Sequence, residues 1–132
     1  MNNLPRLGIK RALEKILIDE CKLDYVESAF TTGVTKKVQV GIPMMNEEYE
    51  RIGMQSKLKT TLSVSIECFS ETNESGVHKA VFDIINIKAT HPLLKEFKIN
   101  RIYPISSDTT YNNESSNGHV SAQVVLNLEY FM

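Results

Sequence analysis

The most regular pattern of apolar and polar positions lies at the C-terminal end of the chain, in residues 119–132. Six apolar side chains occupy consecutive even positions: Val120, Ala122, Val124, Leu126, Leu128 and Tyr130. Four polar side chains lie between them: Ser121, Gln123, Asn127 and Glu129. Because successive side chains of a strand point to opposite faces, this alternation predicts a β-strand with one apolar and one mostly polar face. Its regularity favours a central position in a sheet.

A second stretch, residues 57–69, shows the same alternation. Its even positions are mainly apolar: Leu58, Thr60, Leu62, Val64, Ile66 and Cys68. Its odd positions are mostly polar: Lys57, Lys59, Thr61, Ser63, Ser65 and Glu67. We therefore expect a second strong strand that can pair with the first. Two further strands are predicted at residues 36–45, where Pro43 limits the strand to a sheet edge or an end, and at residues 97–105.

Two other stretches follow the helical period. Residues 5–19 carry one apolar stripe, made of Ile9, Ala12, Leu13, Ile16 and Leu17. Residues 75–88 carry a second stripe, made of Val77, Ala80, Val81, Ile84 and Ile85. Four basic side chains of the first helix lie off its stripe: Arg6, Lys10, Arg11 and Lys15. They form either a basic docking face or, as is more common, an ordinary solvated helix surface.

Two polar stretches, residues 46–56 and 108–118, show no clean period and are predicted to be long loops. The second would join the last two strands in an antiparallel hairpin. Loops of this length are uncommon in compact domains and are often functional. Residues 20–35 are irregular as well.

The resulting order is helix, strand, strand, helix, strand, strand. It predicts an α+β fold with a mostly antiparallel four-stranded sheet and two helices packed on one face, in one domain that spans residues 1–132. The opposite face of the sheet would be polar but interrupted by Phe69, Val125 and Phe131. That face is either a surface for assembly with a neighbour or an ordinary exterior with scattered apolar side chains.

Composition excludes several function classes. The 132 residues have a net charge of −1, which argues against a nucleic-acid binder that works by backbone charge alone. Cys21 and Cys68 are far apart in sequence, so they indicate no disulfide framework or zinc site and fit a reducing, intracellular compartment. Cys68 falls on an apolar face, which predicts a buried, inert thiol. No signal peptide and no apolar run of membrane-spanning length is apparent.

Motifs that carry chemistry are also missing from the sequence. It has no Gly-rich phosphate loop, no GxSxG and no HExxH. The three histidines, His78, His91 and His119, have no partners at metal-ligand spacing, and we expect structural or surface roles for them. The predicted protein is therefore not an enzyme, and it needs no cofactor or metal.

The layout resembles that of the tail terminator, or tail completion, proteins of long-tailed phages. The resemblance extends over the whole chain, and no single motif carries it. The shared features are the N-terminal amphipathic helix (7–18), the strand that ends near Pro43, the strand 57–69, the helix 77–88 with His-Pro-Leu-Leu after it, and a terminal hairpin with a polar tip. The ending Leu-Asn-Leu-Glu-Tyr-Phe-Met is similar to the last strand of that family. The long 46–56 stretch departs from the family pattern.

The resemblance implies a structural virion protein, made in the host cytoplasm and located at the neck-proximal end of the tail. Terminator subunits form a ring, usually a hexamer, that caps the completed tail tube and stops its polymerisation. The implied partners are other copies of the chain, the tail tube protein and a head-closure or connector protein, with DNA only passing through the channel. Two alternatives stay open: another phage neck or minor tail subunit, and a small cytosolic enzyme or ligand-binding domain.

A ring would be held together through sheet edges and the two long polar stretches, because a partner can order segments that are costly to order in a monomer. The candidate assembly residues are Glu47, Glu48, Tyr49, Arg51, Tyr111, Asn112, Asn113 and Glu114.

Overall fold

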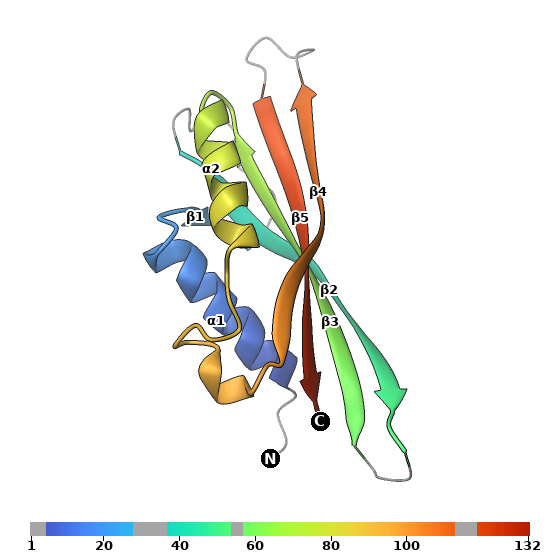
Figure 1. The fold of residues 1–132 in the computed structure, drawn as a ribbon. Coiled ribbons are helices and arrows are strands. Elements are labelled where there is room, and N and C mark those ends of the chain that lie inside the picture. Colours follow the sequence, from blue (N-terminus) through green and yellow to red (C-terminus); the bar gives the residue numbers. More distant parts are fainter. Residues whose placement is uncertain (1–4, 28–36, 54–56, 113–118) are drawn as a thin grey trace.

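The computed structural model describes residues 5–27, 37–53, 57–112 and 119–132. Two α-helices, α1 (Pro5–Asp19) and α2 (Glu74–Ile85), lie on the same face of one sheet (Figure 1). The strands are β1 (Asp24–Tyr25), β2 (Gln39–Arg51), β3 (Leu58–Ser70), β4 (Arg101–Asn112) and β5 (His119–Phe131), and a short 3-10 helix covers Lys95–Phe97. The α+β architecture with both helices on one face agrees with the expectation from the sequence.

The sheet has five strands in the order β1-β2-β3-β5-β4. The prediction of four strands is therefore wrong by one, because the two-residue β1 is too short to leave an alternating pattern in the sequence. β1 pairs in parallel with β2, whereas the other neighbours are antiparallel. The two strands with the clearest alternation, β3 and β5, lie side by side in the centre, as their patterns favoured.

The core lies between the helices and the sheet. The even positions of β3 and β5 point toward the helices, and Leu62, Val64, Leu126 and Leu128 are completely buried there. The apolar stripes of the helices cover them, through Ile9, Leu13, Ile16 and Leu17 on α1 and Val77, Ala80 and Ile84 on α2. Burying each such aliphatic side chain contributes about 1.5–3 kcal/mol to stability. The alternation of apolar and polar residues therefore determines which face of the sheet is buried against the helices.

The second helix has a defined start and end. Asn73 precedes it, and its side-chain oxygen accepts a hydrogen bond from the backbone N–H of Gly76 at 2.9 Å. The helix ends at Ile85, three residues earlier than predicted, with Asn86 as its C-terminal cap. The apolar stripe ends at Ile85 as well, and residues 86–88 of the predicted helix do not extend it.

Two predicted loop segments belong to strands. β2 continues through residues 46–51, and β4 runs from Arg101 to Asn112 instead of over 97–105. The β2–β3 hairpin projects beyond the helices (Figure 1), and all side chains of β4 from Pro104 to Tyr111 are exposed, so neither segment shows an apolar alternation. Pro43 and Pro104 did not end their strands, because each lies at an irregularity of the pairing, at Gly41/Met44 and at Pro104/Ser106.

Candidate assembly surface

The sheet face away from the helices carries a polar network that crosses β3, β5 and β4. Arg101 donates two hydrogen bonds to Glu129, at 2.9 and 3.1 Å, and Tyr103 donates one to the same carboxylate at 3.0 Å. On the next rung, Ser63 donates to Asn127 at 2.6 Å. Strand register places these groups together, because Arg101 lies opposite Glu129, and Asn127 lies opposite both Tyr103 and Ser63. This open face is therefore ordered and largely satisfied within the subunit.

The network stabilises the ionised form of Glu129. The two bonds from Arg101 are the main cause that lowers the pKa of this carboxyl below 4.5, and the bond from Tyr103 adds to it. The residue is only 8% exposed, so the planar guanidinium both pairs with the carboxylate and covers it.

We expect the network to make stability fall at acid pH. A carboxyl whose pKa is lowered in the folded state contributes stability above its unfolded value near 4.5, and this contribution is lost as the pH falls through the folded value. Urea titrations between pH 7 and pH 2 should show a smaller loss of stability for Glu129→Gln than for the parent protein. Parallel curves for the parent and Glu129→Gln would contradict this.

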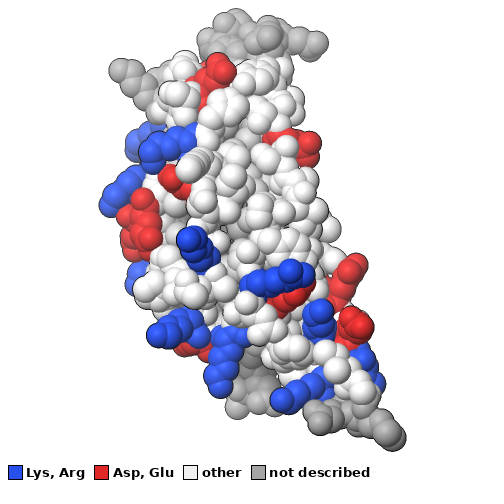
Figure 2. Space-filling model, viewed as in Figure 1, with Lys and Arg blue, Asp and Glu red and all other residues white. Residues whose placement is uncertain are grey.

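The outer edge of β4 forms one side of the sheet. Every side chain from Pro104 to Tyr111 is exposed, and Asp108 is the one charged residue among them. Figure 2 shows the surface over the upper part of β4 and the adjacent flank of α2 as nearly free of charge. Ile105 of β4 is exposed, and so are Phe82 and Ile85, which follow His78 on the flank of α2 that faces Tyr111 of β4. Natural proteins usually protect such an edge with charges, and here Pro104 and the adjacent irregularity protect only its start.

The opposite edge belongs to β2, and its two faces differ. Glu47 points to the helix face, where its side chain is only 2% exposed and accepts bonds from Tyr130 at 2.6 Å, Arg6 at 2.7 Å and Tyr49 at 3.1 Å. Burial and the bond to Glu47 raise the pKa of Tyr130. Glu48 and Glu50 alternate with Glu47 and are exposed on the open face, opposite Thr61 and Lys59 of β3. Glu47 therefore holds the subunit together, whereas its neighbours face outward.

The other candidate residues are divided between the two strand ends. Tyr49 and Arg51 are exposed at the end of β2, and Tyr111 is exposed near the end of β4. Asn112 is the last residue of β4, whereas Asn113 and Glu114 lie outside the described residues. All described members of the set are strand residues, so their assignment to loops was wrong.

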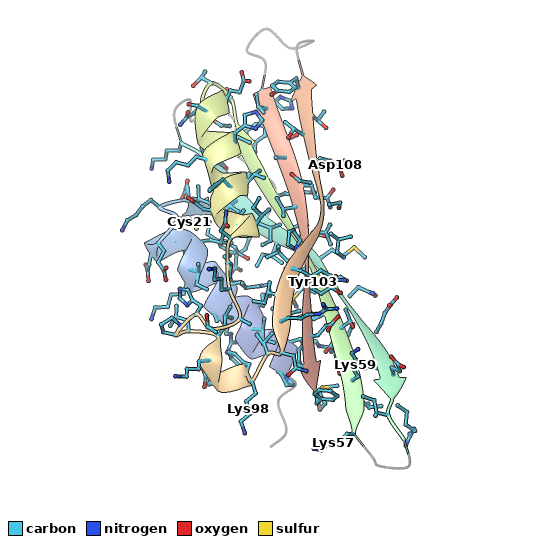
Figure 3. All side chains as sticks on the ribbon, in the orientation of Figure 1. Cys21, Lys57, Lys59, Lys98, Tyr103 and Asp108 are labelled. Atoms are coloured by element: carbon cyan, nitrogen blue, oxygen red, sulfur yellow. The ribbon has the colours of Figure 1, made fainter. Side chains whose placement is uncertain are left out.

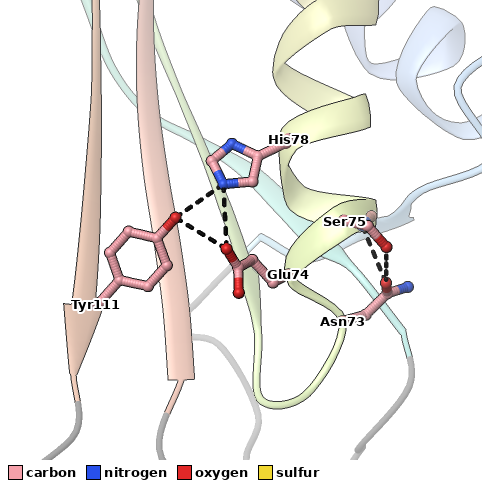
Figure 4. Close-up of polar contacts among 6 residues, drawn as sticks. Asn73, Glu74, Ser75, His78 and Tyr111 are labelled. Carbon is pink, nitrogen blue, oxygen red and sulfur yellow. Dashed lines mark hydrogen bonds and ion pairs between the residues drawn. The ribbon is translucent and has the colours of Figure 1, made fainter.

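Tyr111 also ties the end of β4 to the first turn of α2 (Figure 4). Its hydroxyl donates to Glu74 at 3.1 Å and lies 2.9 Å from Nε2 of His78, which is 3.8 Å from the same carboxylate. A second histidine, His91, lies 2.6 Å from Glu20 and accepts the backbone N–H of Leu93 through Nδ1. These two side chains thus make structural contacts, in line with the roles expected for them.

Two of the four basic side chains on the first helix are engaged within the subunit. Arg6 pairs with Glu47, and Lys10 pairs with Glu14 one turn further along at 2.8 Å. Arg11 and Lys15 are exposed. The contacts of Arg6 and Lys10 favour the interpretation as an ordinary helix surface over that of a continuous basic docking face.

One hollow in the surface lies between α1, α2 and residues 86–92, and Cys21 lines it. Figure 3 places Cys21 beside the C-terminal end of α1, facing α2. Burial, with Asp83 and Glu20 nearby, raises the pKa of its thiol to about 11, and burial raises that of Cys68 to about 12. Within the described part of the chain, no three His, Cys, Asp or Glu side chains come together to hold a metal ion, and no helix could cross a membrane.

Both thiols should be unreactive in the native protein. Because the thiolate is the reactive form, raised pKa values leave only a trace of it at neutral pH. We expect a thiol reagent such as 5,5′-dithiobis(2-nitrobenzoate) at pH 7 to modify folded Cys68 at least 100-fold more slowly than the same residue in guanidinium chloride. A Cys21→Ser variant isolates the signal of Cys68, and fast native labelling of that variant would contradict the buried position.

The residues that sequence reasoning missed are Arg101, Tyr103 and their contacts with Glu129. The polar face of the last strand was visible in the sequence, but its partners depend on the register between β4 and β5. The irregularity between Pro104 and Ser106 shifts that register by one residue, and such a shift could not be predicted from the sequence pattern.

Comparison with solved structures shows that the fold is similar to that of a virion component. The chain is similar to one chain of a solved structure described as "Virion of native gene transfer agent (GTA) particle". The similarity covers 93% of this chain and 92% of that chain, with a TM-score of 0.57 and 8% sequence identity. No family model matches the sequence, and no curated protein matches it significantly. At this identity the similarity establishes a common fold and nothing further.

Proposed function

We propose that the chain is a non-enzymatic structural subunit of a phage-type virion, and specifically a tail terminator. In this role it forms a ring, usually of six copies, on the completed tail tube. The ring stops tube polymerisation and offers a docking surface to the head-closure or connector protein. The observation that carries the proposal is the likeness in fold to a chain of the gene transfer agent virion, which extends over nearly the full length of both chains.

The surface of the subunit supports assembly. The sheet ends in β4 on one side and, beyond the two-residue β1, in the remainder of β2 on the other, and a head-to-tail ring is a closed arrangement that can cover both edges in every copy. The polar network on the open face keeps that face ordered without a partner. The net charge of −1 is compatible with a channel through which DNA passes without strong phosphate binding.

A second candidate is another neck or minor tail subunit, since the same fold likeness supports any structural role in such a virion. Location separates the two roles. Gold labelling of assembled particles with an antibody against the chain should place the label at the head-proximal end of the tail tube, as a terminator requires. Label along the tube or at its distal tip would contradict the proposal.

A further inference from the structure

The direction of the outer strands decides how two copies can meet. Each of the pairs β2–β3, β3–β5 and β5–β4 is antiparallel, so β2 and β4 of one subunit run in opposite directions. When identical subunits stand side by side in the same orientation, β4 of one copy therefore meets β2 of the next in antiparallel fashion. This pairing makes regular hydrogen bonds and repeats around a closed ring.

Charge along the two edges is complementary in this direction. Arg101 is the first residue of β4, and Glu48 and Glu50 lie near the end of β2, so antiparallel strands bring these groups together. The side chain of Arg101 is 65% exposed although it binds Glu129. Within the described residues, Glu47 is the one acid of β2 in an ion pair, and Glu48 and Glu50 have no cationic partner within 4.0 Å.

The faces of the two strands restrict the register. Tyr103 and Asp108 project from β4 on the side away from the helices (Figure 3), and an irregularity between them inserts one extra residue, Ile105. A continuous open face across the junction requires open-face residues to lie opposite one another. A register that meets this condition places Arg101 opposite the last acid of β2. Its pairs are Arg101 with Glu50, Tyr103 with Glu48, Ser106 with Asn46, and Asp108 with Met44.

β1 limits the available part of the second edge. It pairs with Gln39 and Val40 of β2, and Val26 donates a further backbone hydrogen bond to Val40 at 2.9 Å. No other described strand pairs with the outer edge from Met44 to Arg51, and Met44 itself is 62% exposed. With Ile105 as the extra residue, the segment of β4 from Arg101 to Asp108 lies opposite residues 44–50 of this stretch.

We propose that residues 101–108 of β4 pair with residues 44–50 of β2 in the next copy of this chain, so that the sheets of all copies join into one continuous ring. This inference rests on the proposed ring and names the surfaces that build it. The partner is a second copy, because the polarity, the charges and the open faces of the two edges match each other.

Cysteine cross-linking tests the pairing in assembled tails. In a Cys21→Ser background, Asp108→Cys combined with Met44→Cys places two thiols on the open face of the junction. After mild oxidation, a non-reducing denaturing gel should show a ladder at multiples of the 15.0 kDa chain. The matched control combines Asp108→Cys with Met45→Cys, whose side chain points to the helix face opposite Val64, and should stay monomeric. Asp108→Cys alone should also stay monomeric.

Three results would overturn the pairing. Rings seen by electron microscopy without a ladder would refute the edge contact and leave the proposed function standing. Dimers from Asp108→Cys alone would show that β4 pairs with β4 of another copy. The chain remaining monomeric in the presence of tail tubes, with neither rings nor ladder, would refute both the pairing and the proposed ring.

Discussion

Replacing Leu126 by aspartate should abolish cooperative folding. Leu126 is completely buried in the middle of β5, opposite Val64 of β3 and Pro104 of β4. The change loses about 1.5–3 kcal/mol of hydrophobic burial. It also places a carboxylate in an apolar core at a cost of several kcal/mol more. Since a domain of this size is stable by roughly 5–15 kcal/mol, the sum removes most or all of the folding free energy.

The neighbouring residue provides the control for this prediction. Val125 lies on the open face of the same strand and is half-buried, opposite Ser65 and Ser106. Val125→Asp should therefore keep a cooperative thermal transition by circular dichroism, whereas Leu126→Asp should show none. A Leu126→Asp protein that stays soluble and melts like the parent would refute the assignment of the two sheet faces.

Replacing Glu47 by alanine should cost about 2–4 kcal/mol of stability, since hydrogen bonds to a charged group contribute about 1.5–3 kcal/mol each and a buried hydroxyl without an acceptor costs about 1–3 kcal/mol. The carboxylate joins three parts of the chain, through Tyr130 at the end of β5, Arg6 in the first turn of α1, and Tyr49 of β2. Tyr130 is 1% exposed, so its hydroxyl is the group left without a partner. Arg6 and Tyr49 are exposed and contribute little.

Urea denaturation measures this effect directly. Glu47→Ala should lower the midpoint without changing the dependence on denaturant, because the surface exposed on unfolding stays the same. Glu48→Ala, one position away on the open face, should stay within about 0.5 kcal/mol of the parent. Equal effects for the two variants would mean that Glu47 is not the internal anchor of β2.

The core of this fold could be predicted from the sequence because its apolar residues follow two simple periods, that of a strand and that of a helix. The alternation in β3 and β5 and the stripes of α1 and α2 each identify the face that is buried, and the structure confirms these faces. Burial of apolar side chains is the dominant favourable contribution to folding. A strong apolar pattern therefore determines how the helices and the sheet pack against each other.

The edges could not be predicted in the same way. The end of β2 is mostly exposed and its buried helix-face position is the charged Glu47, so residues 46–51 carry no apolar alternation and were interpreted as a loop. The two-residue β1 and the shifts at Gly41/Met44 and Pro104/Ser106 depend on pairing with distant segments. The inward position of Glu47 follows from such a shift, so its separation from Glu48 became visible only in the structure.

The length of tail tubes in particles assembled without this chain tests the proposed function most directly. A terminator stops polymerisation of the tube, so its removal should give tubes that exceed the uniform normal length and carry no heads, as measured on electron micrographs. Supplying the intact chain should restore both the length and the attachment of heads. Tubes of normal, uniform length in its absence would contradict the proposal and assign the chain to another position in the virion.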